Sequence, residues 1–257
     1  MANIIAIANQ KGGVGKTATA SALANELRRK GYNVLMIDAD PQCNTTDAYK
    51  ATVDGQATMY DLMKRECNVS EAIQHTETGD IIACDPELVR ADNNFLESGR
   101  EYLLKEAIEP ILPNYDFVII DTLPGLGVML LNALTAAEGI IIPIGADRDS
   151  LQGLGQLANS IKAIRKYSNP KLKVYGLLVT MLFQNTNLAK SVIESSLPQI
   201  ESALNTKTFS SKIRYTTNVK DARALRQPLV EYAPLSTAAK DYSAFVVELL
   251  QDIEEGK

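Results

Sequence analysis

Short apolar runs alternate along the chain with longer segments in which apolar residues recur at helical spacing. The apolar runs predict buried strands at residues 4–8, 33–37, 80–84, 117–120, 139–144 and 172–180. Helical spacing predicts helices at residues 18–30, 59–63, 101–108, 128–138, 147–167 and 242–253. Because strands alternate with helices, we predict an α/β fold with a doubly wound, mostly parallel β-sheet flanked by helices on both faces.

A glycine-rich segment separates the first predicted strand from the first predicted helix. Its glycines let backbone N–H groups turn inward, and the following helix presents its positive N-terminal end, so both favour a chain of phosphates. Lys16 is expected to pair with the β- and γ-phosphates, and the Thr17 hydroxyl is expected to bind Mg²⁺. The predicted nucleotide-binding residues are Lys11, Gly12, Gly13, Val14, Gly15, Lys16, Thr17 and Ala18. The alternative is a glycine-rich turn with two solvated lysines.

This segment departs from the strict phosphate-loop pattern G-x-x-x-x-G-K-[ST]. Gln10 stands at the first position of that pattern, and a second lysine, Lys11, stands at the entrance of the loop. In this form the loop resembles the deviant Walker A motif of the ParA/MinD family, and the resemblance, of the ParA/Soj type, covers nearly the whole chain. It implies a P-loop ATPase that forms a homodimer on binding ATP, in which Lys11 reaches the partner's nucleotide. No N-K-x-D guanine motif of Ras-type GTPases follows a late strand, and the resemblance favours ATP as the nucleotide.

Carboxylates follow two of the predicted strands. Asp38 and Asp40 come directly after the strand at 33–37, and Asp121 closes the apolar run 117–120. Because ligands of open α/β sheets bind at the carboxyl ends of the strands, we expect these acids beside the phosphate loop. An apolar strand that ends in an acid is typical of a Walker B strand, so Asp121 is predicted to hold Mg²⁺ through a water. For Asp38 and Asp40 the alternative is a pair of turn-forming aspartates before a proline.

The string Asp38-Ala39-Asp40-Pro41-Gln42 resembles the D-x-D-P-Q motif of the ParA family. The resemblance implies that Asp40 positions the attacking water and that Asp38 lies near the Mg²⁺. The implied catalytic residues are then Lys11, Lys16 and Asp40, and the implied metal residues are Thr17, Asp38 and Asp121. The family commonly continues the Walker B acid as D-x-P-P, whereas this chain has Leu123 in place of the first proline.

Basic residues gather in one late segment although the net charge of the chain is −5. Residues 206–227 carry six basic side chains against one acid, which leaves a charge of −10 on the rest of the chain. Such clustering is typical of phosphate-backbone binding. Residues 217–226 also resemble the part of ParA-type proteins that carries non-specific DNA contacts. We therefore predict DNA contacts at Lys220, Arg223 and Arg226; the alternative is a solvated basic helix face.

The last predicted helix carries an apolar stripe and an acidic polar face. A membrane-targeting helix of the MinD kind needs lysine and arginine on that face, so we expect this helix to pack against the protein's own core. No apolar run approaches the length of a membrane span, and we expect a cytoplasmic protein with no membrane partner. The stripe consists of Tyr242, Phe245, Val246, Leu249, Leu250 and Ile253.

Cysteine and histidine give little support for metal or redox chemistry. Cys43, Cys67 and Cys84 lie far apart in the sequence and form no C-x-x-C pair, so neither a metal cluster nor a disulfide framework is expected. His75 is the only histidine and lies in a polar stretch in which we find no partner for it, so we assign it no role.

The resemblance implies a partition ATPase. We expect residues 1–257 to form a single P-loop ATPase domain with no N-terminal DNA-reading extension, because the first strand begins almost at Met1. The implied partners are non-specific DNA and a ParB-like centromere-binding protein that stimulates a weak ATP hydrolysis, with the ATPase associated with the nucleoid. The alternatives are a MinD-like or cargo-positioning ATPase that does not act on DNA, and a biosynthetic P-loop enzyme.

Overall fold

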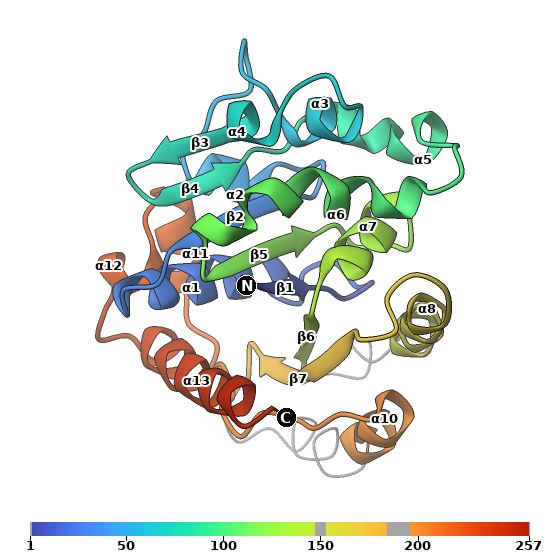
Figure 1. Ribbon diagram of the computed structural model, residues 1–257. Helices are drawn as coiled ribbons and strands as arrows, with labels where there is room; N and C mark the ends of the chain where they lie inside the picture. The colour runs from blue at the N-terminus through green and yellow to red at the C-terminus, as the bar shows by residue number, and fades with distance from the viewer. Residues whose placement is uncertain (1, 147–152, 184–195, 257) are drawn as a thin grey trace.

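The computed structural model describes residues 2–146, 153–183 and 196–256 (Figure 1). Within these ranges, seven strands form one sheet in the order β3-β4-β2-β5-β1-β6-β7. Neighbouring strands are parallel except for the edge pair β3 and β4, which is antiparallel. The strands are β1 (Asn3–Ile7), β2 (Val34–Ala39), β3 (Ile73–Thr76), β4 (Gly79–Ile82), β5 (Phe117–Thr122), β6 (Gly139–Gly145) and β7 (Lys173–Thr180). The predicted doubly wound, mostly parallel sheet is confirmed.

The described helices occupy the connections between strands and the end of the chain. The α-helices are α1 (Lys16–Arg29), α2 (Asn44–Ala48), α3 (Met59–Met63), α4 (Val69–Ala72), α5 (Ala91–Asn94), α6 (Leu103–Ile108), α7 (Val128–Ala136), α8 (Leu154–Tyr167), α10 (Leu197–Leu204), α11 (Asn218–Ala224), α12 (Leu229–Tyr232) and α13 (Thr237–Glu254). Three 3₁₀ helices are η1 (Pro86–Arg90), η2 (Arg100–Tyr102) and η3 (Glu109–Asn114).

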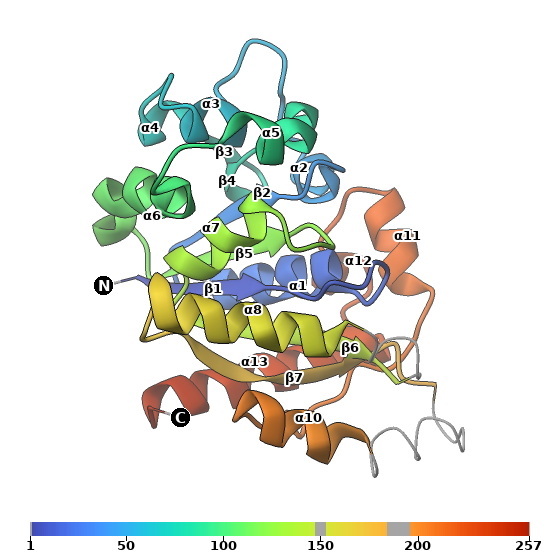
Figure 2. The ribbon, with the colours of Figure 1, turned by 90° about the vertical axis from the view of Figure 1, so that its right-hand side faces the viewer.

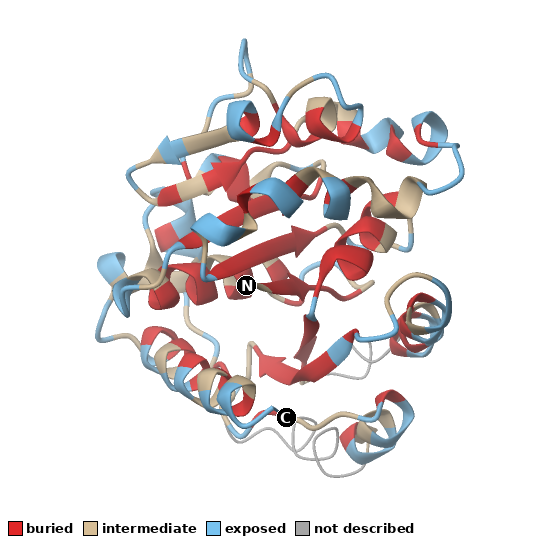
Figure 3. Ribbon diagram, viewed as in Figure 1, coloured by how far each residue is buried: buried red, intermediate tan, exposed pale blue. Residues whose placement is uncertain are grey.

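Helices cover both faces of the central strands. Along β1 the side chains alternate: Ile5 and Ile7 belong to the core under α1 and α13, whereas Ile4 and Ala6 belong to the core under α7 and α8. Because both faces of each central strand are covered, the strands are buried along their length (Figure 3). Double burial explains why these strands appear in the sequence as continuous apolar runs rather than alternating ones.

The last helix, α13, packs along α1, as Figure 1 shows. Phe245 and Leu249 in the predicted apolar stripe are fully buried, and the Tyr242 hydroxyl lies 3.2 Å from the Thr19 hydroxyl of α1. The predicted packing of this helix against the protein's own core is confirmed. Among the described residues, no helix is both long enough and apolar enough to cross a membrane.

Two parts of the chain differ from the predicted elements. Strand β3 was not predicted, because its residues are half-buried or exposed and lie at the antiparallel edge of the sheet, where an apolar run is not required. The predicted helix 101–108 is divided into η2 and α6. The predicted helix 147–167 is described from Leu154 onward, and residues 147–152 lie outside the described residues.

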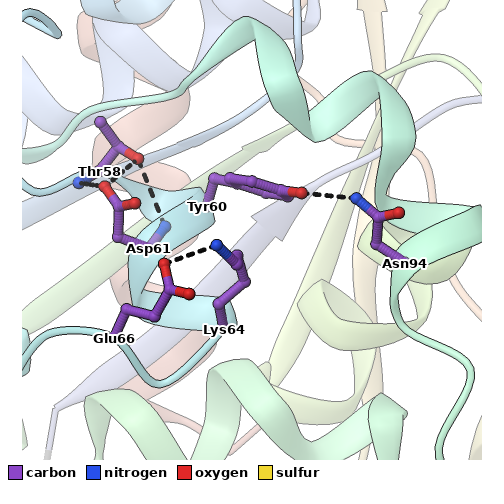
Figure 4. Close-up of polar contacts among 6 residues, drawn as sticks. All are labelled: Thr58, Tyr60, Asp61, Lys64, Glu66 and Asn94. Atoms are coloured by element: carbon purple, nitrogen blue, oxygen red, sulfur yellow. Dashed lines mark hydrogen bonds and ion pairs between the residues drawn. The ribbon is translucent and has the colours of Figure 1, made fainter.

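The segment between β2 and β5 contains several short helices, and two of them, α3 and α4, begin with a capping box. At α3 the Thr58 backbone N–H donates to the Asp61 carboxylate at 2.9 Å, and the Asp61 N–H donates to the Thr58 hydroxyl at 3.4 Å (Figure 4). This reciprocal capping box satisfies donors that a short helix leaves unpaired at its start. The Asn94 amide of α5 donates to the Tyr60 hydroxyl of α3 and joins the two helices.

Candidate functional site

The loop between β1 and α1 is tied to strands β6 and β7, which lie on one side of β1 in the sheet. The Asn9 side chain donates to the carbonyl of Pro143 at 2.7 Å and accepts a hydrogen bond from the Lys11 backbone N–H at 3.0 Å. The Thr180 hydroxyl donates to the carbonyl of Val14 at 2.8 Å. Since β6 and β7 both contribute to these contacts, the loop is held at the carboxyl ends of the strands, which lie at the right-hand side of Figure 2.

Two glycines give this loop its turn. Gly13 and Gly15 have φ angles of +77° and +85°, in the left-handed region that side chains with a Cβ rarely adopt. Gly15 also precedes the first residue of α1, so the loop leads directly into a helix N-terminus. The result is a turn whose backbone N–H groups and helix end can both face an anion.

Lys16 is a buried lysine at the junction between this loop and α1. It is 6% exposed, and its ammonium group donates to the carbonyl of Lys11 at 3.1 Å, so the side chain folds back over the loop. Burial lowers the pKa of Lys16, and the nearby carboxylates of Asp121 and Asp40 oppose that shift. A buried ammonium between a glycine loop and two carboxylates is suited to bind an anion together with a cation.

The predicted acids meet at the same edge of the sheet. Asp38 and Asp121 lie opposite each other on the neighbouring strands β2 and β5, and both are fully buried. Burial, followed by the charge of Asp121, raises the pKa of Asp38 to about 7, and burial raises the pKa of Asp121 to about 6. Asp40 is 6% exposed, and its carboxylate accepts a hydrogen bond from the Gln42 N–H at 3.0 Å.

Two consecutive threonines of α2 hold these acids, and neither was predicted from the sequence. The Thr45 hydroxyl donates to Oδ2 of Asp121 at 2.8 Å. The Thr46 hydroxyl and backbone N–H donate to Oδ2 of Asp38 at 2.8 and 2.7 Å. The available signal was their position shortly after the D-x-D-P-Q string, but hydropathy does not distinguish such threonines from those of an exposed short helix.

We expect the acid pair to weaken the metal-free, nucleotide-free protein as pH rises. The folded-state pKa of Asp38 is above its ordinary value, so the folded state binds this proton more tightly, and the associated stability is lost as pH rises through about 7. Urea unfolding at about pH 5 and about pH 8 should therefore show a larger loss of stability for the wild type than for Asp38→Asn, which cannot ionise. Equal losses in the two proteins would contradict the raised pKa.

A cavity of about 440 Å³ opens between the glycine loop, α1, α2 and the late helices α11 to α13. Most of the predicted nucleotide-binding residues line it, together with Asp40, whereas Asp38 and Asp121 are fully buried and are not among its lining residues. Lys220 and Arg223 from the predicted DNA-contact set also line this cavity. The loop residues on the cavity are Gly12, Gly13, Gly15, Lys16, Thr17 and Ala18, and its apolar wall includes Val219, Ala222, Leu229 and Tyr242.

The predicted DNA-contact residues are exposed on α11 and just after it, and two of them contact α2. Arg226 forms a 2.6 Å ion pair with Asp47, and Arg223 donates a hydrogen bond to Asn44. The ammonium group of Lys220 lies 5.9 Å from the centre of the Tyr215 ring. These contacts place the basic helix beside the short helix that follows the D-x-D-P-Q string (Figure 2).

His75 was predicted to lack a partner, and this prediction is wrong. Its Nδ1 lies 2.7 Å from Asp80, which also accepts a hydrogen bond from the Tyr115 hydroxyl at 2.8 Å. The partner was missed because the antiparallel edge strand β3, which places His75 opposite Asp80, was not predicted. Among the described residues, no group of histidine, cysteine and acidic side chains is arranged to hold a metal ion, and the three cysteines are free thiols.

The similarity of the chain to known proteins extends over almost its full length. A family model described as an AAA domain matches residues 2–174. The sporulation initiation inhibitor protein Soj of Bacillus subtilis is 36% identical over 246 residues, which are 94% of this chain and 96% of Soj. The chromosome-partitioning ATPase Soj of Thermus thermophilus is 34% identical over 98% of this chain and 96% of its own length. The chain belongs to the ParA/Soj family of P-loop ATPases.

The ParA/Soj fold is shared with a biosynthetic enzyme of known structure. Cobyrinic acid a,c-diamide synthase from Mycobacterium smegmatis, solved with bound ADP and magnesium, has a TM-score of 0.85 with this chain. The two are 29% identical, and the similarity covers 100% of this chain and 97% of the synthase. The nucleotide-binding fold alone therefore does not distinguish a partition ATPase from a biosynthetic enzyme.

Proposed function

We propose that this protein is a ParA-type partition ATPase, which binds ATP and Mg²⁺, dimerises on ATP and binds DNA without sequence preference. The proposal rests on one observation: the glycine loop, Asp40 and the basic helix α11 line the same cavity. A nucleotide in that cavity would contact both the hydrolytic residues and the helix that carries the positive charge. Nucleotide state and DNA binding would then be coupled through one site.

The residues present fit ATP and Mg²⁺. The glycine loop and the start of α1 line the cavity, so their backbone N–H groups would bind the phosphates, and Lys16 would supply a cation for the β- and γ-phosphates. One oxygen of Asp121, Oδ1, is buried and accepts no hydrogen bond from any described residue, so the site holds an acceptor that a hydrated cation would satisfy. Thr17 and Asp121 would hold the cation, with Asp38 beside them, and the bound cation would neutralise charge on the phosphates.

Hydrolysis requires a water aligned with the γ-phosphorus. Asp40 would orient this water and accept its proton as the oxygen attacks phosphorus and the bond to the β-phosphate oxygen breaks, giving ADP and phosphate. Lys16 and the loop N–H groups would offset the negative charge of the transferring phosphoryl group. In the dimer, Lys11 of each protomer would add a further cation to the partner's nucleotide.

The ATP-bound dimer would have two partners, non-specific DNA and a ParB-like protein. Two copies of α11 would lie on one assembly, and paired basic surfaces bind duplex DNA more tightly than one because the second contact is intramolecular. A ParB-like centromere-binding protein would stimulate hydrolysis and so release the DNA. The ATPase would associate with the nucleoid and move plasmid or chromosomal DNA, with residues 1–257 acting as one ATPase unit.

We expect loss of the α11 charges to remove DNA retention. Replacing Lys220, Arg223 and Arg226 by glutamine should weaken retention on non-specific duplex DNA and lower the salt slope by about one per lost phosphate contact, measured with ATP, with ADP and without nucleotide. ATP affinity and basal hydrolysis are measured on the same variant, because Lys220 and Arg223 also line the nucleotide cavity.

The matched control removes the same charge from α8 and the turn that follows it. Lys162, Lys166 and Lys171 are exposed, and replacing all three by glutamine changes the net charge equally. Retention lost only in this control would move the DNA surface to α8. Retention lost equally in both variants would show that the total charge, rather than α11, carries binding.

A second candidate function is biosynthetic, because the diamide synthase shares this fold at 29% identity. Such an enzyme would transfer the γ-phosphoryl group to a small acceptor, and its turnover would rise in proportion to that acceptor. A MinD-like positioning ATPase would instead bind neither DNA nor a small acceptor. The absence of DNA retention in every nucleotide state would favour these alternatives over partition.

A further inference from the structure

The buried carboxylate of Asp121 has one oxygen that the protein satisfies and one that it does not. Oδ2 accepts the hydrogen bond from Thr45, whereas Oδ1 is buried and accepts none from the residues that the structure describes. An unsatisfied buried acceptor is costly, so such an atom in a folded protein points to a ligand that completes it. The difference between the two oxygens is therefore set by Thr45.

Thr45 cannot easily place its hydroxyl elsewhere. It is fully buried in α2, and the adjacent Thr46 fixes that helix by donating two hydrogen bonds to Asp38. The Thr46 hydroxyl also accepts a hydrogen bond from the Cys84 N–H at 2.8 Å, which ties α2 to the end of β4. The contacts of the neighbouring Thr46 therefore hold Thr45 in place.

The carboxyl group of Asp121 also lies near the glycine loop and the start of α1. Burial raises the pKa of Asp121, and the Thr45 and Thr17 hydroxyls and the charge of Lys16 oppose that shift, so α1 and α2 approach this carboxyl group from different sides of the chain. With Oδ2 engaged by Thr45, rotation of the carboxylate is restricted. Mg²⁺ demands near-ideal octahedral geometry, so the direction in which a carboxylate oxygen points matters for its binding.

We propose that Thr45 is a positioning residue for the magnesium site: it holds Oδ2 of Asp121 so that Oδ1 is presented to the hydrated cation. This inference rests on the proposed ATP and Mg²⁺ site and adds a residue to it. Partners of this kind orient a metal-binding group without touching the metal, and their loss costs about 10- to 100-fold in metal affinity.

The test compares three threonine variants in Mg²⁺ titrations. Thr45→Val keeps the shape and removes the donor, Thr45→Ser keeps the donor, and Thr135→Val removes a buried hydroxyl of α7 that donates to Ser168 far from the site. Binding of fluorescent methylanthraniloyl-ATP is measured in EDTA and at rising Mg²⁺ concentration. This readout reports metal coupling rather than the rate of hydrolysis.

We expect Thr45→Val to raise the Mg²⁺ concentration for half-maximal tight binding by about tenfold, with nucleotide affinity in EDTA unchanged. Thr45→Ser and Thr135→Val should behave like the wild type. The assignment is overturned if Thr45→Val titrates like the wild type, or if it loses affinity in EDTA as well and serine does not restore the coupling. A wild type that shows no Mg²⁺ dependence would instead overturn the proposed ATP and Mg²⁺ site itself.

Discussion

Replacing Asp40 by asparagine should lower the rate of ATP hydrolysis by about 100- to 1000-fold while leaving ATP binding within a few-fold of the wild type. Asparagine has nearly the same shape and can still accept the hydrogen bond from the Gln42 N–H, so the local turn is preserved. What it loses is the negative charge that would orient the attacking water and accept its proton. Single-turnover hydrolysis and equilibrium ATP binding measure the two effects separately.

A surface carboxylate provides the control for this prediction. Asp54 is exposed in the turn after α2, so Asp54→Asn removes the same charge from a place that does not line the cavity. Its hydrolysis rate should equal that of the wild type. If Asp40→Asn hydrolyses ATP within tenfold of the wild type, another group activates the water. If instead the variant loses ATP binding, Asp40 contributes to the binding of ATP itself and not only to the transition state.

The sheet and the phosphate loop could be predicted because local sequence determines both. Continuous apolar runs such as residues 117–120 identify strands buried on two faces, and Gly13 and Gly15 mark a backbone that only glycine adopts readily. The acids after β2 and β5 were expected near the loop because parallel strands end at a common edge. The structure places all of these groups together.

The hydrogen bonds that hold the site residues in place could not be predicted. They join segments far apart in the sequence, and the side chains that make them do not stand out from other polar residues. Thr45 lies 76 residues from Asp121, and Arg223 lies 179 residues from Asn44. Similarly, His75 meets Asp80 only because an edge strand turns back antiparallel on β4. Pairing of this kind depends on tertiary register, which hydropathy does not encode.

Helix α2 contacts both the buried acids of the proposed cation site and the arginines of the proposed DNA surface. Thr45 and Thr46 on it hold the buried acids Asp121 and Asp38, and its exposed side carries Asn44 and Asp47, which contact Arg223 and Arg226. A shift of α2 on nucleotide binding would therefore alter both the cation site and the contacts of the basic arginines. The exposed ion pair contributes little stability by itself, so its exchange for DNA phosphates would cost little.

Replacing Lys11 by alanine should abolish the ATP-dependent dimer and lower hydrolysis by about 1000-fold, by analogy with other cations supplied in trans to a transferring phosphoryl group. Binding of ATP to the monomer should persist, because Lys16 and the loop N–H groups belong to the same protomer. Size determination by light scattering with ATP and with ADP measures the dimer. Lys30→Ala, an exposed lysine at the end of α1, is the control and should dimerise normally.

Mixing two inactive variants separates action in trans from action within one protomer. A mixed dimer of Lys11→Ala with Asp40→Asn keeps one of the two trans contacts, because the Lys11→Ala protomer keeps its own Asp40 and receives an intact Lys11 from the partner. One of the two sites is then complete, so hydrolysis should return to within about tenfold of the wild type although each variant alone is inactive. If Lys11 acted on its own nucleotide, each site in the mixed dimer would lack one residue, and mixing would restore nothing.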